Sequence, residues 1–115
     1  MTGDGSGEAA LVRAEYVESV LAIVELIPSG RAITYGAIAE LVGRGGPRQV
    51  GWVLALDGGG VPWWRVVRAD GSLPSSHQRE AVARYRSEGT ALLGSVTDAG
   101  RLRVDLRRAL WLPSA

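Results

Sequence analysis

The sequence predicts a mainly α-helical fold with a small β component, in which three helices form a winged-helix-like unit with a helix-turn-helix and a β wing. Three observations predict it. Apolar residues recur at helical spacing ahead of Pro28, two short capped helices follow between residues 34 and 57, and an Asp70-Gly71 pair comes after a β-branched segment. A length of 115 residues with 46% hydrophobic content suffices for one core, so we expect a single domain over residues 11–115.

The first helix is expected to begin near Leu11, after a disordered arm over residues 1–10 that is rich in glycine and alanine. Pro28-Ser29-Gly30 should end it, since proline cannot continue a helix. The apolar stripe has the i, i+3, i+4, i+7 spacing of an amphipathic helix and consists of Val17, Val20, Leu21, Val24 and Ile27. The acidic residues off this stripe are Glu15, Glu18 and Glu25.

Thr34 is the expected N-cap of a second helix, because its hydroxyl can accept a hydrogen bond from a backbone N–H of the first turn. Ile33 and Ile38 are spaced as a hydrophobic staple around this cap. Gly43 can adopt the left-handed conformation that ends a helix.

Pro47 suits the first position of a third helix, because a residue there needs no N–H donor. Two short helices joined by a glycine-containing turn indicate a helix-turn-helix, with the third helix in the recognition role. Its inward side is expected to hold Val50, Val53 and Leu54, and its other side Arg48, Gln49 and Trp52.

Val66-Val67-Arg68 should form a strand, because β-branched residues favour extended structure. Asp70-Gly71 is a hairpin-type turn, so a short β wing should follow before Pro74 breaks it. Alternating apolar and charged residues over 101–106 predict a last strand, hairpinned across Asp98-Ala99-Gly100.

A further helix is predicted between these β segments. Ser75-Ser76-His77-Gln78 has the S-x-x-Q form of a capping box and would open it, and Gly89 would close it. Glu80, Arg84 and Glu88 are spaced for two successive i, i+4 ion pairs, and Val82 and Tyr85 are expected to pack inward.

The absence of cysteine excludes disulfides, thiolate metal sites and cysteine chemistry, and His77, the only histidine, cannot build a zinc site alone. We therefore expect neither a metal nor a cofactor. No segment approaches the roughly 18 consecutive apolar residues of a membrane span, and the acidic, glycine-rich N-terminus is unlike a signal peptide. We expect a soluble monomer that contacts no membrane, located in the cytoplasm and nucleoid-associated if the source is prokaryotic.

The charges are unevenly distributed along the chain, although the net charge is only +1. Residues 1–28 carry one arginine against five acidic residues, and residues 29–68 carry five arginines against two acidic residues, giving minus four and plus three. Residues 69–115 carry seven arginines against five acidic residues, giving plus two. A positive middle segment is expected of a surface that meets DNA phosphates, although so small an excess predicts weak non-specific affinity.

The segment Val61-Pro62-Trp63-Trp64-Arg65-Val66-Val67 places two adjacent indoles between a proline and an arginine. Each indole has a broad apolar face and one N–H donor, which suits a pocket that holds a flat, partly polar group such as a nucleobase. The alternative is that the rings fill the core, and it applies more readily to Trp64 than to Trp63.

The motif Pro62-Trp63-Trp64-Arg65-Val66 resembles the Pro-Cys-His-Arg-Val of methylated-DNA:protein-cysteine methyltransferases, in which the cysteine accepts an alkyl group from O6-alkylguanine. Trp63 stands at the acceptor position, so the chain is similar to the alkyltransferase-like proteins, which bind the lesion and do not repair it directly. The resemblance covers about residues 27–88. Those relatives usually keep the histidine that Trp64 replaces here.

The resemblance implies roles for individual residues. Arg48 matches the arginine finger that enters the duplex and contacts the orphaned base, and Tyr35 matches the tyrosine that helps rotate the target nucleotide outward. Gly51 would let the phosphate backbone approach closely. Arg48 and Tyr35 also have ordinary interpretations, as a solvent-facing helical arginine and a packed tyrosine.

The predicted site has two parts. The lesion pocket is expected to comprise Tyr35, Pro62, Trp63, Trp64 and Arg65. The DNA contacts are expected to comprise Thr34, Tyr35, Gly36, Arg48, Gln49, Gly51 and Trp52, the first three at a helix N-terminus whose N–H groups favour phosphate. Within the motif, Arg65 is expected to orient the loop. Glu88 matches the family glutamate that works through the histidine, and without that partner we expect it to serve only its helix end.

The predicted function is not enzymatic, because no serine lies in a nucleophile-elbow sequence and no cysteine is present. We expect a sensor that binds O6-alkylguanine in double-stranded DNA and flips it into a Trp-lined pocket. The resemblance implies that nucleotide-excision-repair proteins then receive the lesion. Two alternatives stay open: a winged-helix regulator that reads unmodified DNA through the major groove, and a family member that retains the fold alone.

Overall fold

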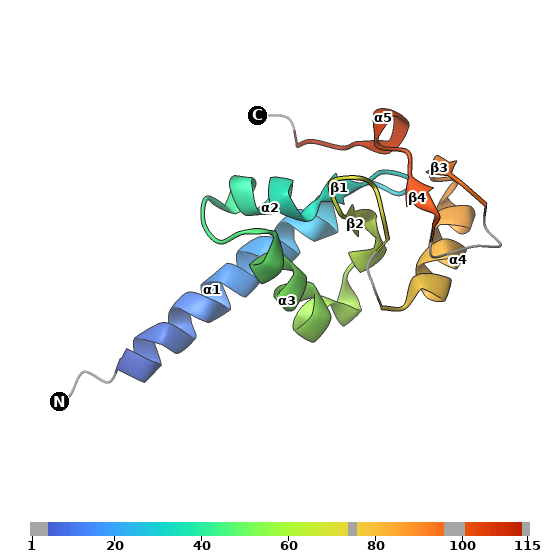
Figure 1. The fold of residues 1–115 in the computed structure, drawn as a ribbon. Helices are drawn as coiled ribbons and strands as arrows, with labels where there is room; N and C mark the ends of the chain where they lie inside the picture. Colours follow the sequence, from blue (N-terminus) through green and yellow to red (C-terminus); the bar gives the residue numbers. More distant parts are fainter. Residues whose placement is uncertain (1–4, 74–75, 96–100, 114–115) are drawn as a thin grey trace.

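Helices dominate the fold, and two small sheets join them (Figure 1). The computed structural model describes residues 5–73, 76–95 and 101–113. The helices are α1 Gly5–Leu26, α2 Tyr35–Val42, α3 Pro47–Asp57, α4 Gln78–Glu88 and α5 Leu106–Ala109, with 3-10 turns η1 Gly58–Gly60 and η2 Trp63–Arg65. The strands are β1 Ile33–Thr34, β2 Val66–Val67, β3 Leu92–Leu93 and β4 Arg103–Val104. The predicted class, mainly helical with a small β component, is confirmed.

Helix α1 begins at Gly5, so the prediction of a disordered arm is wrong for residues 5–10; residues 1–4 lie outside the described part of the chain. Alanine and glutamate are strong helix formers, and extending a helix that is already packed requires no new nucleus. The first half of α1 extends away from the other elements (Figure 1), and Leu11 and Val12 are exposed on it. The helix is therefore longer than its buried stripe.

The local signals of the helix-turn-helix are confirmed. The Thr34 hydroxyl accepts a hydrogen bond from the Ala37 N–H at 3.1 Å, and Gly43 ends α2 in the left-handed conformation with φ of 88°. Pro47 occupies the start of α3. Helices α1, α2 and α3 pack around a first core whose buried residues are Val20, Val24, Ile27, Ile33, Ile38, Ala39, Val50, Val53, Val61 and Val66.

Strands β1 and β2 pair in parallel, with Ile33 opposite Val66 and Thr34 opposite Val67. Successive residues of a strand point to opposite faces, so Val66 enters the first core and Val67 a second one. The second core is formed with α4, β4 and α5 and holds Ala32, Trp64, Val67, Leu73, Ala81, Val82, Tyr85, Leu102, Val104 and Ala109. The two-stranded sheet thus lies between the two cores, and η2 directly precedes it.

The predicted Asp-Gly turn is present after β2. Gly71 has φ of 84°, its N–H donates to the Arg68 carbonyl at 2.8 Å, and the Asp70 carboxylate accepts from the Ser72 N–H at 2.9 Å. The predicted strand is shorter than expected, because Arg68 lies beyond β2. Ser72 forms an isolated antiparallel bridge with Arg103, so this turn joins the second sheet through one residue.

The C-terminal prediction is correct only in part. Strand β4 pairs antiparallel with β3, but it ends at Val104, and Leu106 begins helix α5. The cause is local, since the Asp105 side chain accepts a hydrogen bond from the Arg107 N–H at 3.1 Å and caps the new helix. The expected turn over 98–100 lies outside the described residues.

The predicted capping box of α4 is wrong. The helix begins at Gln78, and its N-cap is His77, which has φ of 59° and makes no capping hydrogen bond through its side chain; Ser75 lies outside the described residues. The pair Glu80–Arg84 forms at 3.8 Å, and Gly89 closes the helix as expected.

No helix within the described ranges combines the length and apolar character needed to cross a bilayer. In the same ranges no three histidine or acidic side chains gather in a way that could hold a metal ion.

Candidate nucleic-acid interface

An open cleft of about 930 Å³ lies beside the recognition helix α3. Its volume falls within the roughly 300–1,000 Å³ of small-ligand pockets. Helix α3, the start of α2, turn η2, the end of β2 and the start of α4 all contribute to it. The lining residues are Tyr35, Pro47, Arg48, Gly51, Trp52, Leu54, Ala55, Gly58, Gly59, Trp63, Arg68, Ser76, His77 and Glu80.

One stripe of α3 forms a wall of this cleft. Arg48, Gly51, Trp52 and Ala55 are spaced i, i+3, i+4 and i+7, so they share a face of the helix. Arg48 is exposed, and Trp52 exposes 61% of its surface. A Cβ atom added to Gly51 would meet nothing within 4 Å, so packing inside the protein does not require glycine there. The backbone of α3 is therefore partly exposed at Gly51, between the side chains of Arg48 and Trp52.

Tyr35, the first residue of α2, lines the cleft next to the sheet. Burial raises the pKa of its hydroxyl, while the nearby Arg68 charge acts to lower it, and the net change is upward. The hydroxyl therefore remains protonated at neutral pH and can donate a hydrogen bond.

Trp63 presents its half-buried indole to the cleft from turn η2. Its ring makes an edge-to-face contact with Trp64, at a centroid distance of 5.7 Å and an interplanar angle of 86°, and it lies 6.0 Å from the His77 ring. Such contacts hold an aromatic ring in one orientation while leaving its other surfaces available for stacking.

Trp64, which was expected in the lesion pocket, does not line the cleft. The ring exposes 9% of its surface and packs in the second core. Its indole N–H donates a hydrogen bond to Glu88 Oε2 at 2.9 Å, the Arg84 guanidinium lies 4.5 Å from its ring centroid, and Tyr85 donates a hydrogen bond to its carbonyl. Neighbouring residues of a tight turn point in different directions, so only one of the two indoles faces the cleft.

Glu88 binds the turn that carries the two indoles, which corrects the expectation that it serves only its helix end. It forms an ion pair with Arg65 at 2.5 Å and accepts hydrogen bonds from Trp64 and, at 3.0 Å, from the Gly30 N–H. The expected Arg84–Glu88 pair is wrong, because this carboxylate turns toward Arg65. Burial alone would raise the pKa of Glu88, but the hydrogen bonds from these three partners outweigh it and lower the pKa.

Arg65 orients the motif turn, as its position in the motif suggested. Besides Glu88, its guanidinium donates to the Ile27 carbonyl at the end of α1, at 2.7 Å. Pro62 and Arg65, also expected in the lesion pocket, belong to the turn but do not line the cleft.

Three of the predicted DNA contacts lie outside the cleft, namely Thr34, Gly36 and Gln49. Thr34 caps α2, and the Gln49 side chain caps α3 by accepting the Gly46 N–H at 2.9 Å. The side chains of Thr34 and Gln49 therefore have hydrogen-bond partners within the protein. Contact of these residues with DNA would involve the surface around the two helix N-termini.

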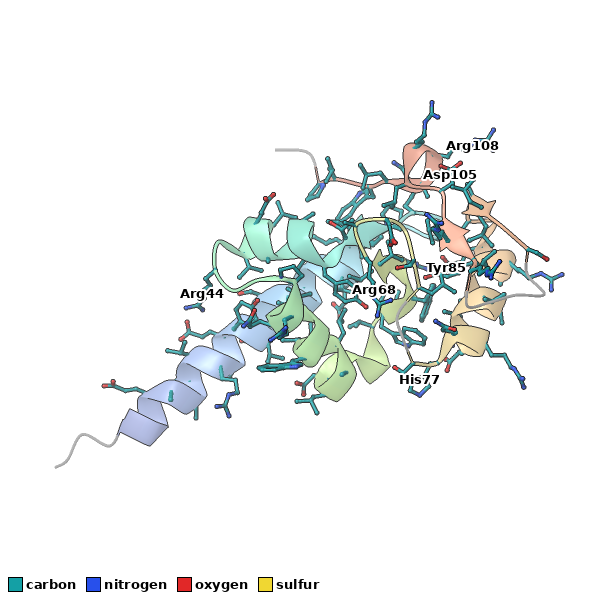
Figure 2. All side chains as sticks on the ribbon, viewed as in Figure 1. Arg44, Arg68, His77, Tyr85, Asp105 and Arg108 are labelled. Atoms are coloured by element: carbon teal, nitrogen blue, oxygen red, sulfur yellow. The ribbon has the colours of Figure 1, made fainter. Side chains whose placement is uncertain are left out.

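Four polar or charged cleft residues were missed from the sequence: Arg68, Ser76, His77 and Glu80. Figure 2 shows the side chains of Arg68 and His77 in the region between α3 and α4. Arg68 follows Val67, which pairs with Thr34, so the parallel register brings it beside Tyr35. No local pattern predicts this pairing, because the two strands are far apart in the sequence.

These features define a small helix-turn-helix protein of the DNA-binding type, with an aromatic cleft beside its recognition helix. Residues 15–90 match the sequence family described as 6-O-methylguanine DNA methyltransferase, DNA binding domain. The chain belongs to this family. It has no cysteine.

The chain is also similar to proteins named for base flipping. It is 35% identical to the DNA base-flipping protein of Escherichia coli K12 over 104 residues, which cover 84% of this chain and 74% of that protein. It is 28% identical to the DNA base-flipping protein of Vibrio parahaemolyticus over 102 residues, which cover 86% and 98%.

Two solved structures have the same fold. One is S. pombe Atl1 in complex with damaged DNA containing O6-carboxymethylguanine, with a TM-score of 0.75, 28% identity, and coverage of 87% of this chain and 97% of that one. The other is S. pombe ATL in complex with DNA, with a TM-score of 0.74 and 29% identity over the same shares of the two chains.

Proposed function

We propose that the protein is a non-enzymatic DNA-damage sensor that binds O6-alkylguanine in duplex DNA, flips it into the cleft beside Trp63 and flags it for nucleotide-excision repair. The observation that carries the proposal is that one cleft brings together Trp63, Tyr35 and Arg48 from three separate elements. The relatives named for base flipping, and the related structure with damaged DNA, support it.

Base flipping requires that the extruded base be held and that its vacated place in the duplex be filled. The Trp63 ring is the stacking surface for the base, and the Tyr35 hydroxyl is the hydrogen-bond donor beside it. Arg48 projects from the exposed start of α3 and fills the gap in the stack. Gly51, one turn later, lets the DNA backbone approach the helix.

Alkyl transfer would need a nucleophile at the position of Trp63, and the chain has no cysteine. The raised pKa of Tyr35 keeps its oxygen protonated and weakly nucleophilic at neutral pH. A protein that holds the lesion without changing it acts by making it recognisable, so transfer to excision-repair proteins is part of the proposal.

The test compares duplexes that differ only by O6-methylguanine in place of guanine. We expect a lower Kd for the modified duplex, measured by fluorescence anisotropy at fixed salt concentration. Equal affinity would contradict the sensor and favour a regulator that reads unmodified DNA.

A second measurement tests Arg48. Arg48→Ala should weaken binding of the modified duplex by roughly 1–3 kcal/mol, or about 5- to 150-fold, because the side chain replaces the flipped base. Arg108→Ala is the matched control, since Arg108 is exposed on α5, away from the cleft (Figure 2). An equal loss of affinity in both variants would indicate that Arg48 contributes only its positive charge to DNA binding.

A further inference from the structure

Arg68 places a positive charge inside the cleft without an acidic partner. It lines the cleft and is exposed, and in the described part of the chain no carboxylate lies within ion-pair distance of it. Its guanidinium donates one long hydrogen bond, 3.5 Å, to the Leu73 carbonyl. By contrast, Arg65 and Arg84 both have a glutamate partner. The donors of Arg68 are therefore available to a ligand.

The sheet fixes where this charge lies. Arg68 follows β2 directly, and the pairing of Thr34 with Val67 places it next to Tyr35. Both side chains line the cleft, and the Arg68 charge acts to lower the pKa of the Tyr35 hydroxyl against the larger rise that burial causes. A base stacked on Trp63 within this cleft would thus have the guanidinium in its immediate surroundings rather than along the outer face of α3.

The other charged groups of the cleft do not cancel this charge. Arg48 has the same sign and lies at the start of α3. Glu80 is the acidic lining residue among those described, and its carboxylate is paired with Arg84 at 3.8 Å. The remaining ionisable lining residues are Tyr35 and His77, and the His77 ring lies against Trp63. A neutral methyl adduct makes no use of a cationic donor, whereas a carboxylate does.

We propose that Arg68 is a specificity-determining residue that favours guanines whose O6 substituent carries a negative charge, with carboxymethyl as the simplest example. The inference rests on the proposed function, because it concerns the lesion held in the same cleft. The guanidinium donates to the carboxylate of the adduct, and no bond is made or broken. It extends the proposed function from lesion binding to a preferred class of lesion.

The experiment uses two duplexes with nearly isosteric adducts, O6-carboxymethylguanine and its neutral amide, O6-carbamoylmethylguanine. We expect about two- to fivefold tighter binding of the carboxylate, since partly exposed ion pairs contribute about 1 kcal/mol or less. The preference should shrink as salt is added, because the pair is open to solvent. A duplex with O6-methylguanine and one with guanine are measured in parallel.

Arg68→Gln should bring the ratio of the two dissociation constants close to one, because this ratio compares two duplexes within one variant and is unaffected by a loss of affinity common to all DNA. Arg68→Lys should restore part of the preference, because it keeps the charge but loses the planar pair of donors. Arg108→Gln is the control and should retain the full preference.

Two outcomes would overturn the inference while the proposed function stands. One is a native protein that prefers O6-methylguanine over guanine but binds carboxylate and amide adducts equally. The other is an Arg68→Gln variant that loses affinity for all four duplexes to the same extent, which would assign Arg68 to a DNA phosphate. Equal binding of all four duplexes by the native protein would refute the proposed function itself.

Discussion

Removing the charge of Glu88 should destabilise the whole protein. Glu88→Gln keeps the shape of the side chain but places an amide group where Arg65 now meets a carboxylate at 2.5 Å. The side chains of Arg65 and Glu88 expose 16% and 10% of their surface, so the arginine would lose its counter-ion in a largely buried place. Removing one partner of a buried pair costs roughly 3–5 kcal/mol, and partial solvent access places the expected loss near 3 kcal/mol.

Thermal and urea unfolding, followed by circular dichroism, measure this loss. About 3 kcal/mol corresponds to a fall in Tm of roughly 10–15 °C for a domain of this size. Glu80→Gln is the matched control, because its pair with Arg84 is 3.8 Å long and both side chains are about half exposed. The control should change the free energy of unfolding by less than about 0.5 kcal/mol.

Glu88→Gln should also change how the free energy of unfolding depends on pH. The pKa of Glu88 lies below its ordinary value of 4.5 in the folded protein, so its contribution to stability is present above that value and is lost as the pH falls through the folded-state pKa. Native protein should therefore lose more stability between pH 6 and acid pH than Glu88→Gln. An unfolding free energy for Glu88→Gln within about 0.5 kcal/mol of the native value would refute the reasoning.

Four other variants test the motif turn and the backbone. Native protein should take no label from O6-methylguanine DNA, and Trp63→Cys should take little, because a thiol of pKa near 8.5 is only about 3% thiolate at pH 7. The double variant Trp63→Cys/Trp64→His should label faster, since Glu88 accepts a hydrogen bond from position 64; equal labelling by both folded variants would argue against this relay. Gly71→Ala should cost about 1–3 kcal/mol in unfolding free energy, because φ is 84° and the new Cβ would collide with the Val104 carbonyl. Gly59→Ala, which meets nothing within 4 Å, should stay near the native value.

The sequence by itself determined the helix-turn-helix and much of its chemistry. The Thr34 cap, the Gly43 stop and the start of α3 at Pro47 depend on groups a few residues apart, so the chain specifies them locally. The same holds for Arg48 and Trp52 on one stripe of α3. The motif around Trp63 could likewise be identified from the sequence, because its residues are contiguous.

The sequence prediction failed where the same residues fit two different local structures. Ser75 to Gln78 has the form of a capping box, yet α4 begins at Gln78 with His77 in a left-handed conformation. Leu106 continues the alternation of a strand, yet the Asp105 cap starts a helix there. In both cases the pattern of residue types is compatible with two conformations, so the pattern alone does not decide between them.

Only the tertiary structure decided which of the two indoles is buried and which groups line the cleft. Glu88 meets its partners 23, 24 and 58 residues away, and these contacts turn Trp64 inward and leave Trp63 facing the cleft. Arg68 reaches Tyr35 through the parallel pairing of β1 and β2. The physical reason is that long-range ion pairs and strand register depend on how separate elements pack, and residue spacing along the chain carries no information about that packing.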